Sequence, residues 1–197
     1  MTEPRILPAG DSGLVIEYGD RIDPAVNRRV RELFLALDQA AVPGVVDLVP
    51  TYRSLLVCYD PLAVSLGALS ERVLDLDARR GELALAPPHV IDIPTVYGGE
   101  FGPDLGFVAQ HNGLTEREVV EIHASADYLV YMMGFSPGFP YLGGMSERIA
   151  APRLKTPRTA IPAGSVGIAQ QQTGIYPVES PGGWQLIGRT PVRLFDP

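Results

Sequence analysis

Histidine is the side chain whose charge changes near neutral pH, and His123 is the best candidate for acid–base chemistry in this sequence. It lies in a segment with helical periodicity that leads into an apolar run. The alternative is a structural histidine, half-buried or solvated on its helix, and both interpretations stay open here. The other two histidines, His89 and His111, make no H-E-x-x-H spacing with it and have no cysteine partner. A metal site is therefore not expected.

Ser165 lies in the run Ala163-Gly-Ser-Val-Gly167, which resembles the G-x-S-x-G nucleophile elbow with alanine in place of the first glycine. An elbow needs a helix after its serine, whereas the following residues, IAQQQTG, have no helical periodicity. A turn at a strand edge is therefore favoured, although the hydroxyl can still donate to a substrate. Neither a G-x-x-x-x-G-K-[ST] run nor a G-x-G-x-x-G run occurs, so these loops hold no nucleotide here.

Four cationic side chains, Arg153, Lys155, Arg158 and Arg189, are spread among loops of an otherwise acidic chain. The planar guanidinium group of arginine matches the geometry of a carboxylate or a phosphate. We therefore expect Arg153 and Arg158 to bind a small anionic substrate. The alternative is that these are ordinary cations scattered over a surface.

Glycine, proline and aromatic residues are concentrated between residues 134 and 191, beginning with the run GFSPGFPYLGG. Glycine permits backbone conformations closed to other residues, while proline fixes φ, so the pattern predicts stiff loops with aromatic walls. The alternative is a barrel with tight corners. For substrate binding we predict Phe135, Pro137, Gly138, Phe139, Tyr141, Arg153, Arg158, Gln172, Thr173 and Trp184. For catalysis we predict His123, Ser165 and Tyr176.

The first half of the chain alternates between strand and helix patterns. The predicted elements are a strand at 14–18, a helix at 24–38, strands at 45–49 and 54–59, a helix at 66–80 and a strand at 90–96. This β-α-β-β-α-β order is the ferredoxin-like pattern. Pro87-Pro88 marks a hinge, which gives domains at 1–87 and 88–197, and the strand at 90–96 can belong to either half.

The second half begins with two predicted helices and ends in short strands. Pro103 starts the first helix, and Asn112-Gly113 ends it with a left-handed cap. Thr115 and Glu118 form a T-x-x-E capping box for the second helix. After a strand at 128–133 the helical periodicity disappears, and Gly/Pro corners predict a β-barrel. The predicted fold class is therefore α+β.

Composition excludes several classes of function. The net charge of −7 and the pI near 4.9 argue against binding to nucleic acid. Cys58 is the one cysteine, which suits a reducing compartment. The N-terminus does not have the pattern of a signal peptide, and no apolar run is long enough to span a bilayer, so no membrane association is expected. We expect a soluble, cytoplasmic protein.

The runs GFSPGFPYLGG and PRLKTPRTAIPAGSVGIAQQQTGIYPVESPGGWQLIGRTPVRLFD closely resemble the carboxyltransferase-type C-D domain family, also called the allophanate hydrolase subunit 1 or KipI family. The resemblance extends upstream through YGGEFGPDLGFVAQHNGLTEREVVEIHASADYLVYMMGF and covers almost the whole chain. It implies a small α/β N-terminal domain followed by a cyclophilin-like β-barrel. Family members usually continue past LFDP into terminal strands, so the barrel is expected to be incomplete at its C-terminal end. Gln170 and Gln171 stand where relatives often have glycine and a small polar residue, which leaves the shape of that loop open.

The resemblance also implies an activity. We expect a subunit of an ATP-dependent 5-oxoprolinase, which cleaves 5-oxoproline to L-glutamate with PxpA-like and PxpC-like (allophanate hydrolase subunit 2) partners. The chain is expected to be inactive alone, and the ATP site is expected on a partner. The alternatives are a KipI-type inhibitor of a sensor histidine kinase and a carboxyltransferase subunit of the allophanate hydrolase or urea carboxylase type. A kinase inhibitor needs only a protein-binding surface, whereas arginines and hydroxyls among stiff loops suit a small anionic substrate better.

Overall fold

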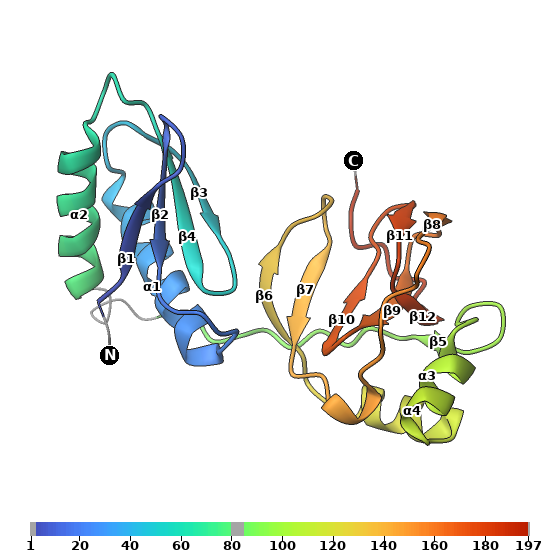
Figure 1. Cartoon of the computed structure of the whole chain (residues 1–197). Helices are drawn as coiled ribbons and strands as arrows, with labels where there is room; N and C mark the ends of the chain where they lie inside the picture. The colour runs from blue at the N-terminus through green and yellow to red at the C-terminus, as the bar shows by residue number, and fades with distance from the viewer. Residues whose placement is uncertain (1–2, 80–84, 197) are drawn as a thin grey trace. The chain divides into compact units, whose positions relative to one another are not determined.

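The chain folds into two compact units, Met1–His89 and Val90–Pro197, each with its own apolar core. The structure, a computed structural model, describes residues 3–79 and 85–196. Figure 1 shows the elements of both units along the chain.

The first unit is built on a four-stranded antiparallel sheet in the order β1-β2-β4-β3 (Figure 1). Its strands are β1 (Arg5–Pro8), β2 (Gly13–Glu17), β3 (Val45–Pro50) and β4 (Ser54–Tyr59). Burial alternates along the two central strands, so Leu14 and Ile16 of β2 share a buried face with Leu55 and Val57 of β4. The predicted strands at 14–18, 45–49 and 54–59 are confirmed.

Two helices pack on the buried face of that sheet. They are α1 (Pro24–Ala40) and α2 (Leu66–Arg79). Asp23 caps α1 because its carboxylate accepts from the N–H of Ala25 at 2.7 Å, and proline follows it at the first helical position. Val30 of α1 and Leu69 of α2 are fully buried against the sheet. The amphipathic spacing that predicted both helices is confirmed.

The predicted strand at 90–96 is wrong, and so is the β-α-β-β-α-β order that depended on it. Residues 85–95 form no strand. The two-residue strand β5 (Val96–Tyr97) comes directly after them, and it pairs with a strand of the second unit. The edge position beside β2 is taken instead by β1, from the N-terminal end of the chain. The observed order in the first unit is β-β-α-β-β-α.

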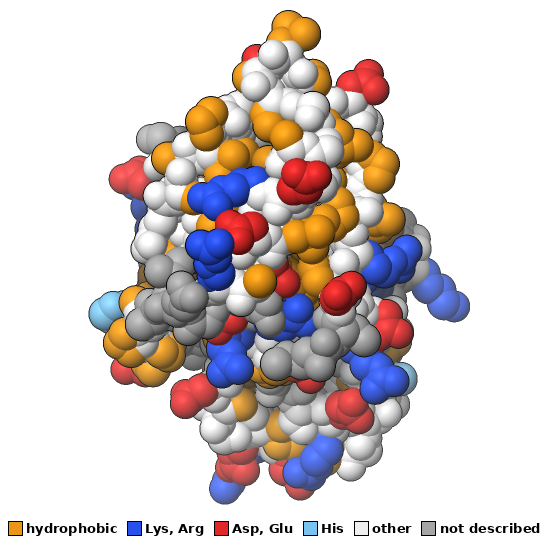
Figure 2. Space-filling model, turned by 90° about the vertical axis from the view of Figure 1, so that its left-hand side faces the viewer, with side chains coloured by type: hydrophobic (Ala, Val, Ile, Leu, Met, Phe, Trp, Pro, Cys, Tyr) orange, Lys and Arg blue, Asp and Glu red, His pale blue; other side chains and the backbone are white. Residues whose placement is uncertain are grey.

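The α2 side of the first unit carries charged side chains of both signs with apolar ones between them (Figure 2). Leu62 is 96% exposed in the segment before α2, and Leu74 is half-exposed on the helix. Asp75 forms ion pairs with Arg72 at 2.8 Å and with Arg79 at 2.6 Å. Within the described ranges, no helix is long and apolar enough to cross a membrane.

The second unit contains a six-stranded sheet in the order β5-β12-β9-β10-β7-β6 and a two-stranded sheet of β8 and β11. After β5, its strands are β6 (Leu129–Met133), β7 (Pro140–Gly143), β8 (Arg158–Ile161), β9 (Ser165–Ala169), β10 (Gln172–Ile175), β11 (Ser180–Gly182) and β12 (Gln185–Arg189). The prediction of short strands joined by Gly/Pro corners is confirmed. Gln170 adopts a left-handed φ of 54° in the tight turn that joins β9 to β10, which resolves the shape of that loop.

Two helices and a short 3-10 helix, Glu147–Ile149, accompany this sheet. The helices are α3 (Leu105–Asn112) and α4 (Glu116–Ala124). Gly113 ends α3 at a φ of 66°, and the predicted capping box opens α4, with the Thr115 hydroxyl accepting from Glu118 N–H and the Glu118 carboxylate accepting from Thr115 N–H. Fully buried Val108 and Val119 join these helices to the sheet residue Ile168.

Candidate functional site

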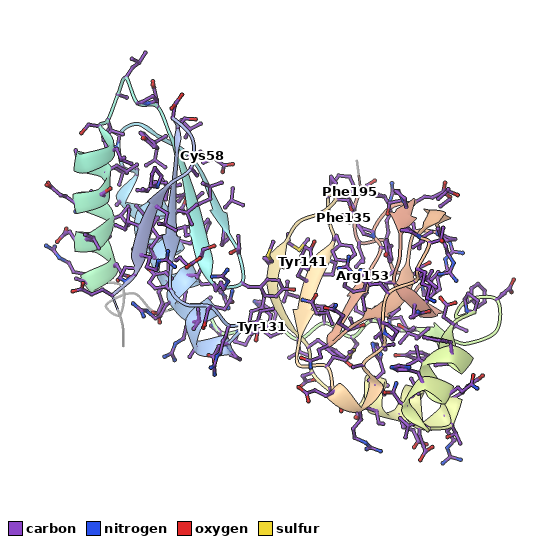
Figure 3. The ribbon with its side chains drawn as sticks, viewed as in Figure 1. Cys58, Tyr131, Phe135, Tyr141, Arg153 and Phe195 are labelled. Carbon is purple, nitrogen blue, oxygen red and sulfur yellow. The ribbon has the colours of Figure 1, made fainter. Side chains whose placement is uncertain are left out.

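The second unit contains a cavity of about 180 Å³ with aromatic walls. Its lining consists of Phe135, Phe139, Tyr141, Arg153, Tyr176, Pro181, Gly182, Gly183 and Trp184. Figure 3 labels three of these, Phe135, Tyr141 and Arg153, which come from the loop after β6, from β7 and from the segment before β8. Segments far apart in the sequence therefore converge on one site, and six of its residues were predicted.

Phe139 is the centre of the aromatic wall and is only 2% exposed. Its ring makes edge contacts with the rings of Tyr141 at 5.1 Å, Tyr176 at 5.6 Å, Trp184 at 5.8 Å and Phe135 at 5.5 Å between centroids. Such T-shaped pairs are favourable beyond their buried area, because the positive edge of one ring meets the negative face of another. The wall is therefore held by the rings themselves.

The loop that presents Phe135 has an unusual backbone. Phe135 has a φ of 63°, which is costly for a bulky residue, and Gly138 has a φ of 81°. The loop is closed by hydrogen bonds from Phe139 N–H to the carbonyl of Ser136 at 3.0 Å and from Gly134 N–H to the carbonyl of Phe139 at 3.2 Å. Phe135 stays 62% exposed at the cavity. Pro137 and Gly138, which were predicted to bind substrate, shape this loop without lining the cavity.

Gly138→Val is expected to lower the free energy of unfolding by about 1–3 kcal/mol and to reduce turnover, while assembly with partner subunits survives. A Cβ at Gly138 would lie 2.8 Å from the Cβ of Phe195 and 3.1 Å from the carbonyl oxygen of Leu194, and φ is in the left-handed region. Urea denaturation and a turnover assay measure both effects. Gly99→Val is the matched control, since φ is 55° there and nothing lies within 4 Å. Unchanged turnover in Gly138→Val would show that the loop is only a structural corner.

The two predicted anion-binding arginines have different surroundings. Arg153 lines the cavity, and its guanidinium carbon lies 6.0 Å from the centre of the Trp184 ring. Among the described residues it forms no ion pair. Arg158 does not line the cavity; it forms an ion pair with Asp104 at 2.8 Å, and the other Asp104 oxygen accepts from Leu186 N–H at 2.6 Å. The geometry leaves Arg153 as the arginine that is available to a ligand.

Arg158→Ala is expected to destabilise the second unit by about 1–3 kcal/mol, because the half-buried Asp104 carboxylate would lose its charged partner. Binding of an anionic ligand in the cavity should not change. Urea denaturation and ligand titration of the same sample give both values. Arg158→Lys is the control that keeps the charge. Unchanged stability together with weaker binding would assign Arg158 to the ligand after all.

Tyr176 is buried at the cavity, with only 2% of its surface exposed. Its backbone is fixed by hydrogen bonds from its N–H to Ser165 O at 2.9 Å and from Gly164 N–H to its carbonyl at 2.7 Å. Burial raises the pKa of the phenol, while the backbone N–H of Trp184 and the charges of Arg153 and Arg158 act in the opposite direction. The net shift of the pKa is upward, so the hydroxyl keeps its proton at neutral pH.

His123 lies outside the cavity lining, in a buried chain of hydrogen bonds. Its Nδ1 is 2.8 Å from the Tyr97 hydroxyl, and its Nε2 is 2.9 Å from the Thr173 hydroxyl, which donates to the carbonyl of Gly167. Because the Thr173 proton is used there, Nε2 carries the histidine proton and Nδ1 accepts from Tyr97. Burial lowers the pKa of His123 to about 4. This arrangement favours the structural interpretation of His123 and places Thr173 with it.

The remaining predicted residues, Ser165 and Gln172, lie on strands and do not line the cavity. Ser165 is the first residue of β9, which continues as a strand to Ala169. The predicted position at the end of a strand is therefore confirmed, and the helix that a nucleophile elbow needs after its serine is not found there. Gln172 starts β10. The described part of the chain contains no group of three or more His, Cys, Asp or Glu that could hold a metal ion.

Three lining residues, Pro181, Gly182 and Gly183, were not predicted. A Cβ at Gly182 would lie 2.3 Å from the Tyr176 hydroxyl oxygen, so only glycine leaves room for the phenol. The Pro-Gly-Gly-Trp run carried this signal, because glycine in a strand often marks a close approach by another group.

Comparison with known proteins agrees with this architecture. The family model of the carboxyltransferase domain, subdomain C and D, matches residues 4–197. The B-type subunit of 5-oxoprolinase from Bacillus subtilis is 47% identical over 203 residues, which cover 98% of this chain and 85% of that protein. The urea amidolyase of Lachancea kluyveri is 27% identical over 95% of this chain and 12% of that protein. The crystal structure of TTHA0988 superposes with a TM-score of 0.81 at 38% identity, over 93% of this chain and 35% of that one. This chain therefore belongs to the carboxyltransferase domain family, subdomain C and D.

Proposed function

We propose that this chain is the B-type subunit of a 5-oxoprolinase, which cleaves 5-oxoproline to L-glutamate at the expense of ATP. The observation that carries the proposal is the 47% identity to the corresponding 5-oxoprolinase subunit of Bacillus subtilis along nearly the whole chain. As one member of a complex, the chain acts together with PxpA-like and PxpC-like proteins and is inactive alone, in the cytoplasm.

The cavity supports a small anionic substrate. 5-Oxoproline is a five-membered lactam with one carboxylate, so its ring can pack against Phe139 and Trp184 while its carboxylate meets Arg153. A cavity of about 180 Å³ is smaller than usual drug-sized sites and does not suit a triphosphate. We therefore place the ATP site on a partner subunit as part of the proposal.

The finer fold assignment is also part of the proposal. The first unit is ferredoxin-like, and its sheet order β1-β2-β4-β3 supports this assignment. In this order β1 lies at the sheet edge beside β2, the position that the last strand takes in a β-α-β-β-α-β unit. The second unit is a cyclophilin-like barrel, supported by its six short strands and the small sheet of β8 and β11. Similarity to TTHA0988 supports the arrangement of elements only in general terms.

A carboxyltransferase subunit of the allophanate hydrolase or urea carboxylase type is the second candidate function, favoured by the 27% identity to a urea amidolyase. The lower identity ranks it second. A KipI-type kinase inhibitor has no use for an arginine beside a buried aromatic wall, so the cavity argues against it.

Co-expression with PxpA-like and PxpC-like proteins tests the proposal. Together, the three proteins should form L-glutamate from 5-oxoproline in an ATP-dependent reaction, and size-exclusion chromatography should show this chain co-eluting with the PxpC-like protein. Omitting this chain should abolish the reaction. If the mixture carboxylates a urea-type substrate and leaves 5-oxoproline unchanged, the second candidate replaces the first.

A further inference from the structure

Each polar side chain of the cavity lining can donate a hydrogen bond, and the tyrosine hydroxyls, those of Tyr141 and Tyr176, can also accept one. Arg153 is the charged residue in the lining, and it has donors only. Trp184 offers an indole N–H, and Tyr176 offers a phenol O–H. Among the residues that the structure describes, no carboxylate lines the cavity. A site with aromatic walls, a guanidinium group and no carboxylate in its described lining favours a ligand that carries negative charge and oxygen acceptors.

The two strongest donors are held in different ways. Arg153 is exposed at the mouth of the cavity and stacked over Trp184, while Tyr176 is buried. The Tyr176 hydroxyl lies against Gly182, where an added Cβ would be 2.3 Å from its oxygen. The ring is fixed by its edge contact with Phe139 at 5.6 Å. The hydroxyl is therefore presented at a set position by a rigid frame.

We propose that the cavity is a two-point site for a small cyclic carboxylate that carries a second, uncharged oxygen acceptor. Arg153 binds the carboxylate, and the Tyr176 hydroxyl donates to the uncharged oxygen, which in 5-oxoproline is the lactam oxygen. Naming 5-oxoproline rests on the proposed function, whereas the two-point recognition rests on the cavity alone.

Tyr176 supplies the specificity in this arrangement. Burial raises the pKa of its phenol and keeps the proton in place, so it can donate to an uncharged oxygen. A ring carboxylate without that oxygen would leave a buried donor unpaired, and sites of this kind reject such analogues. Arg153 supplies affinity for any carboxylate, since its contact does not depend on the rest of the ring.

Titration of the full chain, followed by NMR, with 5-oxoproline and with cyclopentanecarboxylate tests the proposal. The second compound keeps the ring and the carboxylate but has no lactam oxygen. The chain should bind 5-oxoproline about five- to ten-fold more tightly. Tyr176→Phe should remove this difference by weakening 5-oxoproline alone, and Arg153→Gln should weaken both compounds by about thirty-fold.

Tyr128→Phe and Lys155→Ala are the matched controls, because each removes the same kind of group from a residue outside the lining. Both should leave the two affinities unchanged. Equal affinities of the unmodified chain for the two compounds would overturn the proposal without recourse to a variant. A Tyr176→Phe variant that still binds 5-oxoproline more tightly than cyclopentanecarboxylate would also overturn it. Failure of the unmodified chain to bind either compound would do the same. If the complex is active and its turnover is unchanged by Tyr176→Phe and by Arg153→Gln, this inference is wrong but the proposed function still holds.

Discussion

Phe139→Ala is expected to lower the free energy of unfolding of the second unit by about 3–5 kcal/mol, the largest effect of any single substitution proposed for this chain. The ring is 2% exposed and contacts four other rings, so its removal leaves a void that they cannot fill together. Urea denaturation, monitored by the fluorescence of Trp184, reports the loss directly because that ring is one of the four.

Phe107→Ala is the control for Phe139→Ala, since Phe107 is 44% exposed on α3 and its loss should cost under about 1 kcal/mol. Phe139→Leu should lie between the two, because leucine fills part of the void. A cost below about 1 kcal/mol for Phe139→Ala would contradict the central position given to this ring.

Acidification from pH 7 to pH 4 is expected to remove about 3 kcal/mol of stability through His123 alone. Burial lowers its folded pKa to about 4 from the usual 6.5. Between these values the unfolded chain binds the proton and the folded chain does not, so protonation favours unfolding. The contribution is complete above pH 6.5 and falls as the pH falls toward 4.

Chemical denaturation across this pH range, in the unmodified chain and in His123→Gln, isolates the effect. The difference between the two stability curves should change by about 3 kcal/mol over the range, because other titrating groups are common to both. His89→Gln, which removes an exposed histidine, should show no such change. A flat difference for His123→Gln would mean that His123 is already protonated or solvated in the folded chain.

Local signals in the sequence were sufficient to predict most helices and strands. The Asp23-Pro24 pair marked the start of α1, and the capping box at Thr115 and Glu118 marked the start of α4. The Asn112-Gly113 pair marked the left-handed end of α3. Each of these signals acts within one helical turn, so no knowledge of distant packing was needed.

The strand pairing of the first unit was less predictable, because an edge position can be filled from either end of a chain. The apolar residues at 90–96 have the composition of a strand, but β1 occupies the place beside β2. β1 is four residues long and ends at Pro8, so its residues show too short an alternating pattern to predict a strand. Its pairing with β2, from Arg5 opposite Glu17 to Pro8 opposite Leu14, is a long-range contact that its own sequence does not show.

Most of the cavity lining was predictable from the sequence, including Arg153 and Tyr176, whereas the interaction partners of the other polar candidates were not. Rings that share one Gly/Pro-rich stretch are brought together by short connections, so Phe135, Phe139 and Tyr141 could be assigned together. His123 contacts the hydroxyl of Thr173, which is 50 residues away in the sequence, and Arg158 contacts the carboxylate of Asp104, which is 54 residues away. Such distant contacts favour a structural interpretation of both side chains, and no local pattern in the sequence indicates them.

The most direct test of the account is the kcat/KM for 5-oxoproline of the reconstituted three-protein complex carrying Arg153→Gln, compared with the complex carrying Lys155→Ala. Both variants remove one positive charge from the same exposed segment, but only Arg153 lines the cavity. Arg153→Gln should lower kcat/KM about thirty-fold, or ~2 kcal/mol, the lower end of the range for a charged contact because the side chain is exposed in the free chain. Lys155→Ala should stay close to the unmodified complex. Equal kcat/KM values for the two variants would contradict the claim that this cavity holds the substrate.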